Sequence, residues 1–240
     1  MLPKQGLFQD QIPERGHDMD VVDAIRSRKS IRGFKPDPVP RETIREILDA
    51  AIRAPSNENS HPWEITVVSG EALDNIRRGN IEMLASGAMP NPDVVMSGLK
   101  DTYRQRQVDI AVQLFQLMGI AREDKEKRAE WMQRGFRFFD APVGIILYAD
   151  DSLDPMHTQF DISAVAQGIC LAALNYGLGT CIEIQGVMYP EVVRKYTDIP
   201  ESKRISISIA LGYPDWGFPA NKVQSVREPV GNITTWCGFD

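Results

Sequence analysis

The sequence predicts an α+β domain in which a small mixed or antiparallel sheet is wrapped by helices. The expected strands, at residues 65–68, 143–148 and 205–211, are short and bordered by Gly or Pro turn signals. Helical patterns lie between them at irregular intervals, without the regular alternation that a parallel βαβ sheet would show. The chain has 240 residues, 42% of them hydrophobic, which is enough to bury a sizeable core.

Residues 43–53 carry the clearest helical pattern. Apolar side chains recur there at positions i, i+3, i+4 and i+7, and the Ala-Pro pair at 54–55 ends the pattern. A short helix before it is expected to start after Asp18 or Asp20, either of which can cap its N-terminus. A further helix is expected over residues 71–84, ahead of a loop rich in Gly, Pro and Asn.

Two longer stretches have a distinctive composition. Residues 99–139 predict two helices that break near Gly119, with many Met and aromatic side chains that either pack in the core or line a substrate pocket. Residues 162–176 contain only three polar side chains. A helix that is apolar on nearly all sides must be buried, so this one is either a central core helix or the seam of a dimer.

The two ends of the chain lack helical patterns. Residues 1–19 are expected to form an extended N-terminal arm, and residues 20–240 a single domain. Residues 215–240 are expected to form an arm that crosses to a partner subunit, because a helix-free tail must bury something to be ordered. Together with the apolar helix at 162–176, this arm predicts a homodimer.

Composition excludes several classes of protein. The net charge of −6 argues against binding of nucleic acid, and no run of 18 apolar residues could span a membrane. The first twenty residues lack the apolar core of a secretory signal. The three cysteines, Cys170, Cys181 and Cys237, are widely spaced, which favours a reducing cytoplasm over a disulfide framework.

Motifs for metal, nucleophilic and phosphate-loop chemistry are missing from the sequence. The three histidines have no metal-type spacing to Cys, Asp or Glu, so no metal site is expected. Residues 177–182 begin like a dinucleotide-binding motif but lack its third glycine and follow a helix instead of a strand. Any difficult chemistry is therefore expected to come from a cofactor, or the protein carries out none.

Two segments carry the strongest functional signals. Residues 28–34 read RKSIRGF and lie in a run of ten residues with five basic side chains and no acidic one. Residues 54–63 read APSNENSHPW and directly follow the helix at 43–53. Cations of the first segment can make charge-assisted hydrogen bonds to a phosphate.

This pair of segments resembles the flavin-binding segments of the nitroreductase family, whose patterns are RxSxRxF and APSxxNxQPW. Residues 176–180, 211–215 and 227–229 resemble later landmarks of that family in the same order. The resemblance implies a nitroreductase-like fold, an intertwined homodimer and FMN as cofactor, with NADH or NADPH as co-substrate. It also implies ping-pong, two-electron reduction of nitroaromatic, quinone or similar flat, electron-poor substrates.

The resemblance assigns the FMN-binding residues to four places. The phosphate is bound by Arg28, Lys29, Ser30 and Arg227. Arg32 lies beside ring atom N1, where a fixed positive charge favours the reduced ring, and no side chain acts as a catalytic residue. The loop contributes Pro55, Ser56, Asn57 and Asn59, of which the first two approach the ring from the neighbouring subunit. Backbone groups around Glu183 and Ile184 face ring atom N5.

One departure and two alternatives accompany this interpretation. His61 stands where the family has Gln, and it can still donate one hydrogen bond. Relatives include reductive dehalogenases and ene-type reductases, but Leu99 stands four residues before Tyr103, where the deiodinase lid has an acid. The second alternative is a flavin-binding or anion-binding module without turnover.

Overall fold

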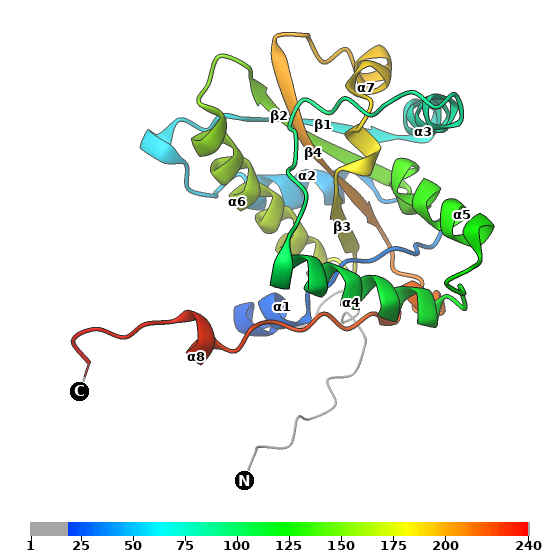
Figure 1. Cartoon of the computed structure of the whole chain (residues 1–240). Coiled ribbons are helices and arrows are strands. Elements are labelled where there is room, and N and C mark those ends of the chain that lie inside the picture. Colours follow the sequence, from blue (N-terminus) through cyan, green and yellow to red (C-terminus); the bar gives the residue numbers. More distant parts are fainter. Residues whose placement is uncertain (1–18, 240) are drawn as a thin grey trace.

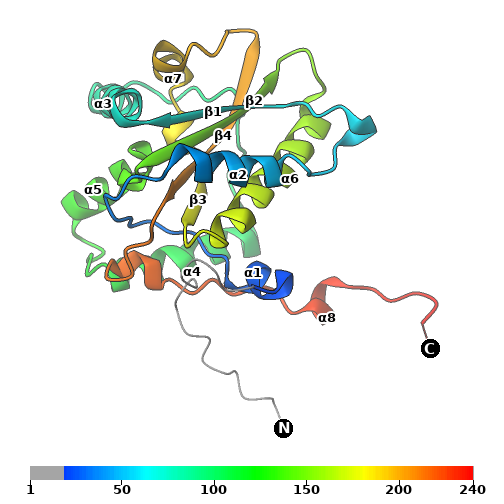
Figure 2. The same cartoon turned by 180° about the vertical axis from the view of Figure 1, so that it is seen from behind.

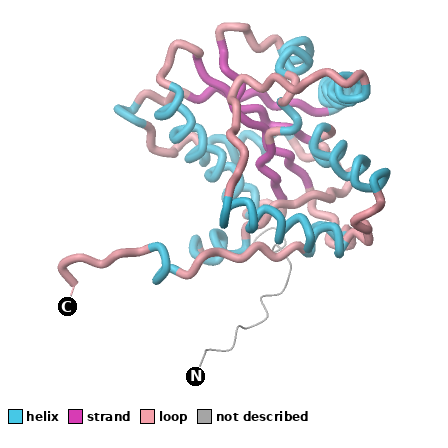
Figure 3. Tube along the Cα trace, viewed as in Figure 1, coloured by secondary structure: helices cyan, strands magenta, loops and turns pink. Residues whose placement is uncertain are grey.

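The computed structural model describes residues 19–239, and four strands lie at the centre of this part of the chain (Figures 1 and 3). They are β1 (Trp63–Ser69), β2 (Val143–Asp150), β3 (Gly179–Glu183) and β4 (Lys203–Gly212). Their order is β1-β2-β4-β3, and every neighbouring pair is antiparallel. The predicted α+β class and small antiparallel sheet are confirmed, and β3 adds a strand that the sequence pattern did not indicate.

One face of the sheet packs against α2 (Arg41–Ala51) and α6 (Pro155–Leu174), which lie next to each other (Figure 2). Successive side chains of a strand point to opposite faces. Val143, Ile145 and Leu147 of β2 therefore all enter the core on the α2–α6 side. The helix predicted at 43–53 is thus confirmed, and its apolar stripe is the face that packs on the sheet.

The other face of the sheet is covered by α3 (Gly70–Ala85) and α7 (Pro190–Thr197), with the end of α5 (Lys125–Phe136) beside them (Figure 1). Ile146 of β2 points into this second core. The largest fully buried side chain there is Tyr189, whose hydroxyl donates to the carbonyl of Ala88 at 2.9 Å. Two helical layers therefore enclose one sheet.

Helix α6 is longer than the predicted range. It starts at Pro155 because Asp154 caps its N-terminus and accepts a hydrogen bond from the backbone N–H of His157 at 2.9 Å. Ile162 and Ile169 are fully buried against the sheet, whereas Ser163 and Gln167 lie on an exposed stripe. Within one chain, α6 is thus a core helix with one open side.

The region at 99–139 forms two helices, as predicted. Helix α4 (Asp101–Leu117) ends just before Gly119, whose φ of 64° is a left-handed conformation that glycine adopts without strain. Helix α5 follows after a short turn. Leu114 is the one fully buried side chain of α4, which therefore lies on the surface of the domain.

The ends of the described chain carry short helices. Asp20 caps α1 (Val21–Ser27) by accepting from the N–H of Val22 at 2.8 Å. The C-terminal segment contains η4 (Pro219–Lys222) and α8 (Val230–Ile233), so the prediction of a helix-free tail was wrong. Four residues are too few to show a helical period in the sequence. The arm predicted at 1–19 lies almost entirely outside the described residues.

No helix among residues 19–239 is long and apolar enough to span a membrane.

Candidate functional site

The basic segment that follows α1 is bound to the edge of the sheet. The N–H of Ile31 donates to the carbonyl of Thr180 in β3 at 2.9 Å, and Ser30 forms a parallel bridge with Thr180. Four residues later, the N–H of Lys35 donates to the carbonyl of Tyr213 at 2.8 Å. These bonds hold residues 30–35 along β3 and the end of β4.

Asn221, a buried residue of η4, holds the middle of this segment. Its Oδ1 accepts from the N–H groups of Arg32 at 2.7 Å and Gly33 at 3.1 Å. Its Nδ2 donates to the carbonyl of Gly33 at 2.7 Å. The ring of Phe218 fills the space that a Cβ at position 33 would need, which explains the glycine.

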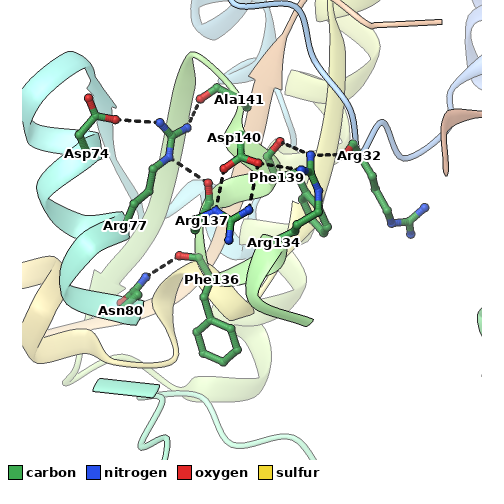
Figure 4. A network of polar contacts seen from close by, with 10 residues as sticks. All are labelled: Arg32, Asp74, Arg77, Asn80, Arg134, Phe136, Arg137, Phe139, Asp140 and Ala141. Carbon is green, nitrogen blue, oxygen red and sulfur yellow. Dashed lines mark hydrogen bonds and ion pairs between the residues drawn. The ribbon is translucent and has the colours of Figure 1, made fainter. Parts of the chain in front are cut away.

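The fourth backbone group of residues 32 and 33, the carbonyl of Arg32, is bonded by Arg134 of α5. Its Nη2 donates to the carbonyl of Arg32 at 3.2 Å. Both N–H groups and both carbonyls of residues 32 and 33 are therefore hydrogen-bonded. Figure 4 shows that the carbonyl of Arg32 faces Arg134 while the Arg32 side chain points away from the cluster. The guanidinium of Arg32 thus projects from a fixed backbone.

The side chains of this segment have the charge and the partial burial that suit an anion. Arg28, Lys29, Ser30 and Arg32 are all half-buried. Within the described residues, no carboxylate lies in ion-pair distance of Arg28 or Arg32. Partly buried cations without an acidic neighbour are suited to charge-assisted hydrogen bonds with a phosphate.

Buried, neutral thiols lie close to this segment. Burial raises the pKa of Cys181 to about 11, against the opposing effect of the Arg32 charge. Burial also raises the pKa of Cys170, which lies near Arg28. Both cysteines are free, and neither is a thiolate at neutral pH.

Glu183 is buried at the end of β3 and holds the turn that follows. Its Oε2 accepts from the N–H of Gly186 at 2.7 Å, and its Oε1 lies 2.6 Å from Oγ of Ser208. Burial raises the pKa of Glu183 to about 7. Oγ of Ser208 also lies 3.0 Å from the backbone carbonyl of Glu183. A protonated carboxyl can donate to that hydroxyl, which then donates its single proton to the carbonyl.

A left-handed turn at residues 138–140 is linked both to the basic segment and to the turn after β3. Phe138, Phe139 and Asp140 have φ values of 55°, 51° and 58°, which are costly for residues with side chains. Guanidinium groups compensate part of this cost (Figure 4): Arg134 bonds the carbonyl of Phe139 and pairs with Asp140, and Arg137 also pairs with Asp140.

Asn80 and Phe138 connect this turn to the turn after β3. Nδ2 of Asn80 donates to the carbonyl of Phe136 at 3.0 Å and to the carbonyl of Gly186 at 2.9 Å. A Cβ at Gly186 would lie 2.7 Å from the ring of Phe138, so the ring packs directly against this glycine. The left-handed turn therefore supports residues 32 and 186 at the same time.

The second sequence motif forms a strained loop before β1. The carboxylate of Asp161 in α6 accepts from the N–H of Asn57 at 3.1 Å, and Oγ of Ser56 accepts from the N–H of His61 at 3.0 Å. Glu58, Asn59 and His61 have positive φ values. Nε2 of His61 lies 2.9 Å from Oδ1 of Asn59, so this ring nitrogen carries the proton and donates to Asn59.

The structure keeps the two motifs apart within one chain. The loop is bonded to Asp161 near the start of α6, whereas the basic segment is bonded to Thr180, beyond the end of α6 at Leu174. Thirteen helical residues correspond to about 20 Å. Figures 1 and 2 place the two segments at opposite ends of α6. Within one chain, the two motif segments therefore do not come together.

Arg227 lies on the C-terminal segment beside α4. Its Nη1 donates to Oγ of Ser225 at 2.9 Å and to the carbonyl of Val226 at 3.1 Å. It lines a groove of about 310 Å³ together with Arg106, which pairs with Glu228 at 2.6 Å. The guanidinium of Arg227 is exposed at this groove.

Comparison with known proteins assigns the chain to a family. The model of the nitroreductase family matches residues 25–213. The chain belongs to the nitroreductase family. It is 33% identical to the nitrobenzene nitroreductase of Ectopseudomonas oleovorans, over 90% of this chain and 96% of that relative. It is 31% identical to the 4-nitrobenzoate reductase of Pseudomonas putida, over 93% of this chain and 97% of that one.

Solved structures agree with this assignment. The FMN- and NADPH-dependent nitroreductase NfnB of Sphigopyxis sp. strain HMH superposes with a TM-score of 0.87 at 28% identity, over 92% of this chain and all of that one. The FMN-dependent NfnB of Mycobacterium smegmatis, in complex with NADPH, gives a TM-score of 0.84 at 27% identity, over 91% of this chain and all of that one. The resemblance read from the motifs is therefore confirmed, and so is the nitroreductase-like fold.

The nitroreductase also contains site residues that sequence reasoning missed. Asn221, Arg134, Asp161 and Ser208 each hold a segment that the motifs identified, but none belongs to a motif. The signal that could have found Asp161 is an acidic residue at the edge of the apolar stretch at 162–176. Asn221 and Arg134 carry no such signal.

The raised pKa of Glu183 gives a testable dependence of stability on pH. Between the ordinary value of 4.5 and the folded value of about 7, the folded protein keeps this proton and the unfolded chain has lost it. The free energy of unfolding therefore falls as pH rises through this window, by about 3 kcal/mol. Glu183→Gln, which keeps both hydrogen bonds without a charge, should lack this fall.

Urea unfolding of the flavin-free protein at pH 5 and pH 8 measures this difference. Glu191→Gln, at an exposed position of α7, is the matched control and should behave as the wild type does. Equal losses of stability in wild type and Glu183→Gln would contradict the assignment.

Proposed function

We propose that this nitroreductase binds FMN and uses NADH or NADPH to reduce nitroaromatic, quinone or similar flat, electron-poor substrates. The observation that carries the proposal is the half-buried run of Arg28, Lys29, Ser30 and Arg32, held rigidly against β3 and without acidic partners for Arg28 and Arg32 in the described chain. Relatives named for nitrobenzene and 4-nitrobenzoate reduction, matched over nearly their whole length, support the substrate class.

The donor set of the chain fits FMN. Arg28, Lys29 and Ser30 offer hydrogen bonds to the phosphate, and Arg227 adds a further guanidinium from the C-terminal segment. Arg32 and Asn59 serve the polar edge of the ring; His61 orients the amide of Asn59 so that its Nδ2 remains for another acceptor. Backbone groups at Glu183 and Ile184 lie on a turn that Asn80 and Ser208 hold in place.

In the mechanism, the protein positions FMN and shifts the balance between its oxidised and reduced states. When bound, FMN supplies the redox chemistry by taking a hydride from the nicotinamide and returning two electrons to the oxidant. The guanidinium of Arg32 supplies a fixed positive charge at the ring edge, which favours the more negative, reduced state of the cofactor. Residues 99–139, where Tyr103 and Met132 are exposed, are assigned the role of covering a flat substrate and excluding water.

The complete site requires a second copy of the chain. The whole loop at residues 55–59, with Pro55, Ser56, Asn57 and Asn59, lies at the far end of α6 from the basic segment, so it serves the cofactor of a partner subunit. Large apolar side chains are also exposed on α1 and on the C-terminal segment: Val21, Ile25, Val230, Ile233, Trp236 and Phe239. Such surfaces mark interfaces between proteins. The protein is therefore a homodimer in which residues 215–240 cross to the partner.

The cysteines support a place in the cytoplasm. Cys170 and Cys181 are free and buried, and Cys237 is free and exposed. Unpaired cysteines are characteristic of a reducing compartment. Extraction of the native protein with its thiols intact would agree with this location.

An anaerobic titration tests the proposed function. The purified protein should be yellow, NADH or NADPH should bleach its flavin, and nitrobenzene should then restore the colour with two electrons per flavin. Steady-state rates should give parallel double-reciprocal lines, because both substrates use one face in turn. A colourless protein would contradict FMN binding, and a flavin that is not bleached would indicate a carrier without turnover. Intersecting lines would indicate two separate substrate sites.

Arg227→Ala should retain FMN less tightly. Loss of one charge-assisted pair to the phosphate costs about 1.5–3 kcal/mol, which is roughly ten- to a hundredfold in affinity. Arg45→Ala is the matched control, because Arg45 pairs with Glu42 on the exposed face of α2, away from the site. Full flavin occupancy of Arg227→Ala after dialysis would remove this residue from the phosphate site.

A further inference from the structure

We propose that Arg134 is a positioning residue that fixes Arg32 and thereby sets how strongly the site prefers reduced over oxidised FMN. This inference rests on the proposed function, because it concerns the cofactor beside Arg32. Arg134 lies on α5, outside the motifs that the family resemblance identified. The structure nevertheless bonds it directly to the backbone of the central cation of the site.

The contacts of Arg134 converge on one peptide. Nη2 donates to the carbonyl of Arg32 at 3.2 Å, and the guanidinium lies 4.8 Å from the ring centroid of Phe218. That same ring fills the space above Gly33. Arg134 therefore holds the peptide between residues 32 and 33 both by a hydrogen bond and through the packing of Phe218.

The guanidinium of Arg134 is itself held in place. Nη1 pairs with Asp140 at 2.9 Å, and Nη2 also lies 3.3 Å from the carbonyl of Phe139. Both partners belong to the left-handed turn, and Arg77 bonds the carbonyls of Arg137 and Ala141 that flank this turn (Figure 4). Only 20% of the Arg134 side chain is exposed. A charged group in this setting has little freedom to follow a displaced partner.

The consequence concerns the direction of the Arg32 side chain. A carbonyl that loses its donor in a packed site must find another partner, and the peptide turns to do so. The Arg32 carbonyl and the Gly33 N–H belong to one planar peptide, so this turn would also loosen the 3.1 Å bond from Gly33 to Asn221 and leave the 2.7 Å bond from Arg32 as the tighter hold on the segment. The guanidinium of Arg32 would then leave its position, and the preference for the reduced cofactor would weaken.

Arg137 provides a matched control. It follows Arg134 by three residues, directly after the end of α5, and pairs with the same carboxylate, Asp140, at 2.8 Å. Its side chain is 28% exposed, close to the value for Arg134. No bond joins its side chain to residues 30–35 in the described chain. Arg137→Gln therefore removes the same charge from the same ion-pair cluster without touching Arg32.

The test is a double-mutant cycle on the midpoint potential of bound FMN. Arg134→Gln should weaken the preference for reduced FMN about tenfold, which lowers a two-electron potential by about 30 mV. Arg137→Gln should leave the potential unchanged. In an Arg32→Gln background, Arg134→Gln should add nothing, since it acts through Arg32. An unchanged potential in Arg134→Gln, or an equal shift in Arg137→Gln or in the Arg32→Gln background, would overturn the proposal.

A second measurement needs no flavin. Amide hydrogen exchange at residues 31–35 of the flavin-free protein should be several-fold faster in Arg134→Gln than in Arg137→Gln, because the segment is released. Equal exchange rates would overturn the positioning role even if Arg134→Gln proved too unstable for redox titration. If wild-type protein held no FMN, the proposed function would fail separately, and the exchange rates would still decide whether Arg134 fixes the segment.

Discussion

The separation of the two motif segments is set by hydrogen bonds near the start of α6 and in β3, beyond the end of α6. Asp161 bonds the loop through Asn57, and Thr180 bonds the basic segment through Ile31. Because α6 is packed along the sheet through Ile162 and Ile169, the distance between its ends cannot adapt. A single chain therefore presents the cations in one place and the loop in another, and under the proposed function the site is completed where two chains meet.

Buried polar side chains fix the segments around the candidate site. Asn221, Asn80 and Glu183 are almost fully buried, and each bonds backbone groups of a segment that faces the site. Buried polar groups are costly when they lack partners, so such residues tolerate one arrangement of their surroundings. The left-handed turn at 138–140 is likewise held in one arrangement, since the guanidinium groups around it offset the energetic cost of its positive φ angles. The cofactor is expected to meet a site that is already formed.

The sequence predicted what local patterns encode. Helices α2 and α6, the break near Gly119 and the strands β1, β2 and β4 follow from apolar period, caps and breakers. The strand β3 is short and begins with glycine, and the four residues of α8 have no period to read. Both therefore escaped prediction.

The candidate site likewise contains residues that local sequence patterns reveal and residues that they do not. Its motif residues are contiguous in the sequence, whereas the residues that hold them are remote: Asn221 lies 189 positions from Arg32, and Arg134 lies 102 positions away. Such pairs depend on the packing of distant elements, which no local pattern records. The left-handed conformation of Phe138 and Phe139 is equally hidden, because phenylalanine gives no signal for positive φ.

The proposed division of the site between two chains is tested most directly by complementation. One variant, Arg28→Ala with Arg32→Ala, loses the cations; another, Ser56→Ala with Asn59→Ala, loses the loop contacts. Each should lose FMN as a homodimer. Co-expressed with different tags and purified as a heterodimer, the pair should retain one FMN per two chains, because one of its two sites is intact. A heterodimer as empty as both parents would show that each chain builds its own site, and the account would be wrong.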